Sequence, residues 1–197
     1  MIKLGVLGST KGTDLQKIIE TEKLGQLKAE LSVVISNKKD AYILERAKAY
    51  NIPAIHISLK NKTREMFESR VTLALEKYHV DLILLIGFMR ILSAEFCQTW
   101  KNKIINVHPS LLPKYSGGMD SSVHEQVLKS KDIESGCTIH YVTEQVDAGQ
   151  IIMQKRCQIE KNETVETLKS KVQQLEGEAF VQVINKLGKK LYLNRIG

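Results

Sequence analysis

The sequence predicts an α/β fold: a doubly wound, mostly parallel sheet with an antiparallel portion toward the C-terminus. In the first half of the chain, short apolar runs alternate with stretches whose apolar residues recur at helical spacing. One run, residues 81–87, is apolar almost throughout, as a parallel strand covered on both faces should be. In the second half, two apolar runs are separated only by a short polar segment, which favours an antiparallel pair.

The first predicted strand is Ile2 to Leu7, and the helix after it, Asp14 to Leu24, carries an apolar stripe. Strand and helix then alternate, with strands at 31–36, 54–57 and 81–87 and helices at 41–50 and 64–78. This alternation predicts helices on both faces of one sheet.

The second half begins with a strand at 103–107 and a turn that contains two prolines. A helix around 123–129, strands at 136–142 and 150–159, and a long helix at 164–187 follow. No repeat, low-complexity tract or flexible linker separates the halves. We therefore expect one domain over residues 1–197, in which the second half completes the sheet of the first.

Composition limits the classes of function. The chain has 197 residues, is 43% hydrophobic and has no apolar run of bilayer length or signal peptide, so we expect a cytoplasmic protein without a membrane partner. Cys97, Cys137 and Cys157 match no CxxC spacing, which favours free thiols over structural zinc. The net charge of +7 comes from scattered lysines, so solvated faces are favoured over a nucleic-acid surface. Monomer and homodimer both remain open.

The first strand leads into a glycine-bearing loop, Gly8 to Asp14, at the edge where ligands of such sheets bind. Its backbone N–H groups at a helix start would suit a phosphate. A tight turn with Thr13 or Asp14 as N-cap explains the loop about as well. The segment 88–92, after the strand that ends at Gly87, stays apolar; packing is favoured over a ligand wall.

The central candidates are Asn106 and His108, which project to one face because they stand two apart on a strand. Pro109 keeps His108 out of a helix, and Leu112-Pro113 is a second rigid point that could hold a cis bond. Asp147 has the side chain needed to pair with His108 and raise its pKa. Catalytic and purely structural roles for this set are about equally favoured.

The remaining histidines are weaker candidates. Three of them lie in or beside apolar elements and are interpreted as structural: His56, His79 and His140. His124 is intermediate, because it follows the polar loop 116–122.

Three motifs along the chain resemble those of the phosphoribosylglycinamide formyltransferases, folate-dependent enzymes of purine synthesis. They are Gly87-Phe88-Met89-Arg90-Ile91-Leu92, Asn106-Val107-His108-Pro109-Ser110-Leu111-Leu112-Pro113, and Gly136 to Val142 followed by Asp147-Ala148-Gly149. The resemblance implies formyl transfer from 10-formyltetrahydrofolate to the primary amine of glycinamide ribonucleotide, with no metal and no covalent enzyme intermediate. It also implies a phosphate-binding, Rossmann-like half over 1–100 and a catalytic half over 101–197.

The resemblance implies site residues as well. Asn106, His108 and Asp147 would be catalytic, the first two stabilising the tetrahedral oxyanion and the third assisting proton transfer. The ribonucleotide would contact four residues, Gly12, Thr13, Asp14 and Glu176. The folate would contact Asn106 together with Arg64, Met89, Arg90, Ile91 and Leu92.

The chain departs from the family pattern in two places. The stretch Tyr115 to His124 is longer than in some relatives, and Asp14 stands where many have asparagine. Because a carboxylate would repel a phosphate, we expect Asp14 to cap the helix or to contribute mainly its backbone N–H. Methionyl-tRNA formyltransferase, formyltetrahydrofolate hydrolase and a sugar-nucleotide formyltransferase are less favoured readings, and a non-catalytic phosphate or folate binder has no need of all three catalytic residues.

Overall fold

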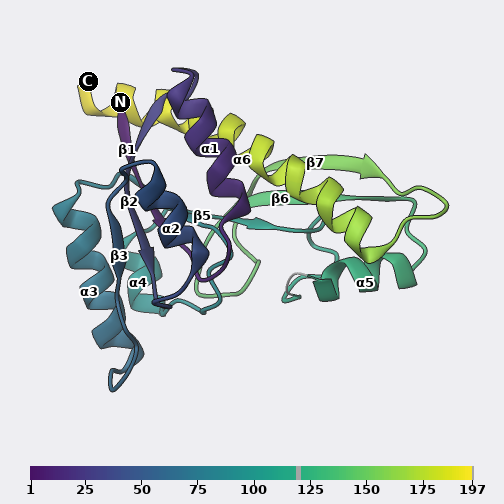
Figure 1. Ribbon diagram of the computed structural model, residues 1–197, viewed down its shortest axis with the longest axis horizontal. Helices are drawn as coiled ribbons and strands as arrows, with labels where there is room; N and C mark the ends of the chain where they lie inside the picture. The colour runs from purple at the N-terminus through teal and green to yellow at the C-terminus, as the bar shows by residue number, and fades with distance from the viewer. Residues whose placement is uncertain (119–120, 197) are drawn as a thin grey trace.

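The computed structural model describes residues 1–118 and 121–196, and within the polar loop 116–122 it leaves Met119 and Asp120 outside the described residues. Seven strands form one sheet in the order β3-β2-β1-β4-β5-β6-β7 (Figure 1). The strands are β1 (Ile2–Leu7), β2 (Ala29–Ser36), β3 (Ala54–His56), β4 (Leu82–Leu85), β5 (Ile104–His108), β6 (Glu134–Tyr141) and β7 (Ile151–Gln158). The first five are parallel, whereas β6 and β7 are antiparallel to their neighbours. The predicted fold class is confirmed.

Within the described part of the chain, six helices cover the sheet. They are α1 (Thr13–Lys23), α2 (Tyr42–Ala49), α3 (Arg64–Lys77), α4 (Ala94–Thr99), α5 (Ser121–Lys129) and α6 (Val165–Ile196). Side chains of α1, α2, α5 and α6 belong to one apolar cluster, and those of α3 and α4 to another. The two clusters use alternate residues of β4, such as Leu82 and Ile83, so this strand is buried on both faces. No described helix combines the length and the apolar character that a bilayer crossing requires.

Helix α6 runs across both halves of the molecule (Figure 1). It packs on β6 and β7 and also on α1, β1 and β2. Near its far end, Asn185 accepts a hydrogen bond from the Lys28 backbone N–H at 2.7 Å and donates one to the Gln26 carbonyl at 3.0 Å. The predicted helix ended at Leu187, but the observed helix continues to Ile196. Helix α4, only six residues long, was not predicted.

The strand order reverses between β1 and β4, and at this point the loops that leave the two strands meet. The Ser9 backbone N–H donates to the Gly87 carbonyl at 3.1 Å, and the Met89 N–H donates to Ser9 Oγ at 3.1 Å. Ser9 Oγ in turn donates to Asn37 Oδ1 at 2.6 Å. The predicted phosphate loop and the predicted folate segment are therefore joined to each other.

Candidate functional site

Strand β5 carries Asn106 and His108 on one face, next to the antiparallel strand β6. Asn106 stands opposite His140 in the register, and His108 opposite Thr138. His108 is only 3% exposed. Asn106 and His108 thus lie on one face of the strand, as their spacing of two predicted. The neighbouring strand adds a second histidine, His140, to that face.

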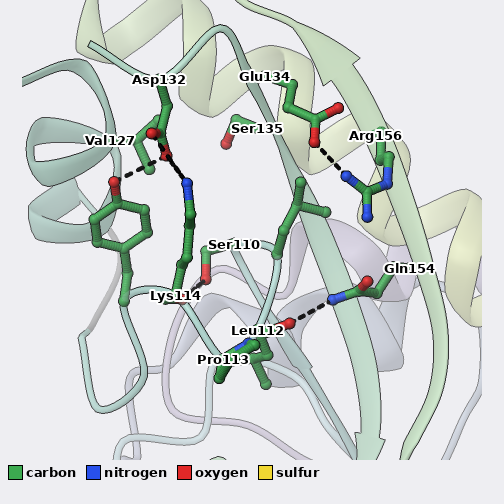
Figure 2. Close-up of a pocket in the computed structure, with 12 residues that line it drawn as sticks. Ser110, Leu112, Pro113, Lys114, Val127, Asp132, Glu134, Ser135, Gln154 and Arg156 are labelled. Carbon is green, nitrogen blue, oxygen red and sulfur yellow. Dashed lines mark hydrogen bonds and ion pairs between the residues drawn. The ribbon is translucent and has the colours of Figure 1, made fainter. Parts of the chain in front are cut away.

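The turn after His108 is held in place by hydrogen bonds from β6 and β7. Thr138 Oγ1 donates to the Ser110 carbonyl at 2.7 Å and accepts from the Leu112 N–H at 3.1 Å. Gln154 Nε2 donates to the Leu112 carbonyl at 2.9 Å (Figure 2). The peptide bond between Leu112 and Pro113 is cis, as the sequence allowed. The conformation of the backbone after β5 is therefore fixed by hydrogen bonds from β6 and β7.

A cavity of about 210 Å³ lies beneath this turn, and Asp132 lines it (Figure 2). Both oxygens of Asp132 lie 3.1 Å from Lys114 Nζ, and Oδ2 also accepts a hydrogen bond from the Tyr115 hydroxyl at 2.9 Å. The Tyr115 carbonyl oxygen lies 2.9 Å from His108 Nε2. Asp132 therefore anchors the residue whose carbonyl orients the His108 ring.

Asp147 lies within hydrogen-bonding reach of His108. Its Oδ2 is 3.2 Å from His108 Nδ1 and accepts the Gly117 backbone N–H at 2.8 Å. The loop between β6 and β7 folds back and brings the Asp147 carboxylate, which is 9% exposed, onto His108. Gly149 makes this possible, since a Cβ there would collide with the Tyr141 carbonyl oxygen.

His140 is the residue that sequence reasoning missed. Its side chain is 3% exposed, Nε2 lies 3.2 Å from Asn106 Nδ2, and Asp147 Oδ1 lies 3.6 Å away. Nδ1 donates to the Tyr141 carbonyl at 2.9 Å, which leaves Nε2 of the neutral ring as an acceptor for the Asn106 amide. The interpretation of His140 as structural did not anticipate that its ring lies beside Asn106 and Asp147. Its place in an apolar strand gave no sign of this, whereas the register of β6 against β5 shows it.

Opposing effects act on the protonation of His108. Both ring nitrogens face acceptors, which favours the imidazolium. Burial nevertheless lowers the pKa of His108 below its ordinary value, against the raising effects of Asp147 and the Tyr115 carbonyl, and His140 lowers it further. Asp147 thus acts in the expected direction, but burial outweighs it. The pKa of His108 therefore lies below its ordinary value despite the neighbouring carboxylate.

A cavity of about 460 Å³ between α1 and α6 brings two of the predicted substrate residues, Thr13 and Asp14, against Ser170 and Gln173. Glu176, one helical turn after Gln173, is 7% exposed. Gln173, which the sequence did not single out, stands three residues before Glu176 and so lies on the same side of the helix. The N-cap of α1 is Gly12, with a φ of 64° and no side-chain cap, so the expectation that Thr13 or Asp14 caps the helix is wrong.

The predicted folate residues are spread along one edge of the sheet. Met89, Arg90 and Ile91 are exposed in the loop after β4, whereas Leu92 is buried. Arg64 stands apart at the start of α3, where its Nε lies 3.7 Å from Glu65 Oε1. None of the hydrogen bonds or ion pairs found among the described residues joins Arg64 to the loop 89–92.

The loop 87–92 is anchored at its far end by a buried carboxyl. Glu68 of α3, which is 5% exposed, accepts the Ser93 backbone N–H at 2.8 Å and also the Ser93 hydroxyl. Ser93 Oγ caps α4 by accepting the Phe96 N–H at 3.1 Å. The loop is thus held between Ser9 at one end and Glu68 at the other, with its exposed residues between them.

Comparisons with known proteins find a family model, related sequences and solved structures that each match most of the chain. A family model described as formyl transferase matches residues 2–184, which include every candidate site residue. The human trifunctional purine biosynthetic protein adenosine-3 is 41% identical over 179 residues, but these cover 90% of this chain and only 17% of that protein. The Haemophilus influenzae phosphoribosylglycinamide formyltransferase is 38% identical over 185 residues, which cover 93% of this chain and 86% of the relative. The crystal structure of glycinamide ribonucleotide transformylase 1 from Symbiobacterium toebii matches with a TM-score of 0.91 and 34% identity, covering 96% of this chain and 89% of that one.

Proposed function

The chain belongs to the formyl transferase family, and we propose that it transfers the formyl group of 10-formyltetrahydrofolate to the primary amine of glycinamide ribonucleotide in purine biosynthesis. The observation that carries the proposal is the 3.2 Å contact between His108 and Asp147 beside Asn106. An amide, an imidazole and a carboxylate are gathered on one face, as amine attack on a formyl carbon requires. The proposal places the enzyme in the cytoplasm, acting on small molecules.

The reaction develops negative charge on the formyl oxygen as the amine attacks. One N–H of Asn106 is directed to His140, and the second is left for that oxygen. Protonated His108 would be the other donor. Each such donor is worth about 3 kcal/mol to a transition state of this kind.

Proton transfer falls to the pair of His108 and Asp147. The attacking amine must lose a proton when the tetrahedral intermediate forms, and the folate nitrogen must gain one when it leaves. Asp147 would accept the amine proton through water and favour the charged form of His108. Because burial lowers the pKa of His108, its protonation would accompany the charge that develops on the substrate.

The two substrates would approach from different sides. The cavity at Thr13, Asp14 and Gln173 would take the ribonucleotide, whose phosphate would meet the N–H groups at the start of α1. The exposed loop after β4 would offer backbone groups to the folate ring, and Arg64 would face the folate carboxylates. The net charge of +7 favours both substrates, since both are anionic.

The test supplies 10-formyltetrahydrofolate and glycinamide ribonucleotide and follows folate deformylation. We expect turnover in the wild type and losses of about 100- to 1,000-fold in kcat for His108→Ala and Asp147→Asn. Two exposed positions serve as matched controls, His56→Ala and Asp40→Asn, which should keep wild-type rates. No turnover in the wild type, or full activity in both site variants, would defeat the proposal. Deformylation that needs no ribonucleotide would indicate a hydrolase, and formylation of methionyl-tRNA alone would indicate a different acceptor.

A further inference from the structure

Asp14 is a buried carboxyl in the lining of the cavity between α1 and α6. It is the second residue of α1, is 8% exposed and lines the cavity, yet its Oδ1 has no hydrogen-bond partner. The helix is capped by Gly12 without any side-chain bond, so the Asp14 carboxyl does not cap the helix through a hydrogen bond. A buried carboxyl oxygen without a partner calls for an explanation, because leaving such an atom unsatisfied is costly.

A second buried carboxyl acts on the same region. Glu176 of α6 is 7% exposed, and after burial, which is the largest cause, both Glu176 and Asp14 raise the pKa of the Cys137 thiol on β6. The two carboxyls therefore act electrostatically on the same buried thiol. Two ionised carboxylates at such a place would repel each other and would also repel an anionic ligand.

The other charged groups around the cavity belong to three helices and to strand β7. Lys17 and Glu20 of α1 and Glu178 of α6 line it. Glu178 faces Lys155 at 2.6 Å. Arg46 of α2 donates to the Lys11 carbonyl and to the Gln16 side chain. Burial raises the pKa of Asp14 to about 7, so the neutral acid is well populated at neutral pH.

We propose that Asp14 binds the ligand as a neutral carboxylic acid and donates its proton in a hydrogen bond to a phosphate oxygen, so that the phosphate-bearing substrate binds together with a proton. This inference rests on the proposed function for the identity of that substrate. A neutral acid supplies the donor that an anion needs, whereas an ionised Asp14 would oppose it. The burial of Asp14 and its unpartnered Oδ1 are the features that favour the neutral form.

The inference fixes the direction of a pH effect on affinity. Above neutral pH, free Asp14 loses its proton and binding must recover it, so the dissociation constant rises toward about tenfold for each pH unit. The phosphate itself also ionises near pH 6, but this affects every variant equally. Asp14→Asn keeps a neutral side chain of the same shape at all pH values, so its affinity should lack the alkaline decline.

The test measures binding of glycinamide ribonucleotide, and of inorganic phosphate as a simpler probe, by calorimetry between about pH 6 and 9. Buffers of different ionisation enthalpy report the protons taken up. We expect proton uptake at about pH 8 in the wild type and in the matched control Asp40→Asn, but none in Asp14→Asn. Equal pH slopes and equal proton uptake in Asp14→Asn and wild type would overturn the inference.

A second measurement requires no ligand. Because the folded-state pKa of Asp14 is raised, the folded protein holds a proton that the unfolded chain has lost between about pH 4 and pH 7. As pH rises through this window, the melting temperature of the wild type should therefore fall relative to that of Asp14→Asn. Above the window, the difference between the two melting temperatures should be constant. A difference that does not vary with pH would overturn the inference.

The two proposals fail in different ways. Formyl transfer with identical pH slopes in wild type and Asp14→Asn would overturn the inference and leave the proposed function standing. Proton-linked ribonucleotide binding without formyl transfer would support the inference about Asp14 and overturn the proposed function.

Discussion

The side-chain amide of Asn106 donates to Nε2 of His140 at 3.2 Å, and the His140 ring is held by its own bond to the Tyr141 carbonyl. The amide that would face the reacting oxygen is therefore oriented by a neighbouring strand. The site has two histidines with separate tasks: His108 faces Asp147 at 3.2 Å, while His140 orients Asn106.

Replacing His140 by leucine should lower kcat by about 10- to 100-fold and leave both KM values within about threefold, since positioning rather than contact with substrate is lost. His140→Gln, which retains an acceptor, should recover part of that rate. Steady-state kinetics with both substrates would check this. A rise in KM at constant kcat, or equal losses in the two variants, would contradict a positioning role.

The pKa of His108 should lie below its ordinary value of 6.5 and should fall further in Asp147→Asn, because the variant removes a raising influence and leaves burial in place. The unfolded chain then binds more protons than the folded one just below pH 6.5, so His108 costs the protein stability as pH falls through that window. An NMR titration of the imidazole in both proteins would measure the shift. An unchanged or raised pKa in the variant would contradict the prediction.

Thr138→Val should destabilise the protein by about 1–3 kcal/mol, because it leaves the Ser110 carbonyl and the Leu112 N–H without their buried partner. The turn after His108 would also lose the hydrogen bonds that fix its conformation, so kcat should fall. Urea unfolding gives the first quantity and turnover the second. Thr99→Val, at an exposed threonine bonded only within its own helix, is the control and should cost under about 0.5 kcal/mol.

Glu68→Gln should act selectively on the folate. The variant keeps one acceptor for Ser93 but gives up the other, which loosens the far end of the loop 87–92. We expect KM for 10-formyltetrahydrofolate to rise by roughly tenfold with KM for the ribonucleotide little changed. Equal rises in both KM values would point to general loosening of the fold instead.

The fold was predictable because the central parallel strands are buried and leave nearly continuous apolar runs, such as Leu82 to Leu85. Helix α4 was missed because six residues are too few to display a period. The pairing of His108 with Asp147 was plausible from residue type alone. Its distance depends on how the loop after β6 folds back, which spacing along the chain does not encode.

The positions of His140 and Gln173 depend on neighbours distant in the chain. The register of β6 against β5 places His140 beside Asn106, and the packing of α6 on α1 places Gln173 at the cavity that Asp14 also lines. The helix cap was misassigned because propensity favours Thr13 or Asp14, whereas the chain enters α1 through Gly12 in a left-handed conformation.

The long reach of α6 has a consequence for how the protein is made. The helix follows all seven strands in the chain, yet it covers β1 and β2 and is hydrogen-bonded to Lys28, the residue just before β2. During synthesis, the apolar face formed by the earliest strands stays uncovered until α6 has left the ribosome. The first half is therefore expected to remain partly folded during translation and to bind chaperones. The cavity between α1 and α6 can form only after the helix has been translated.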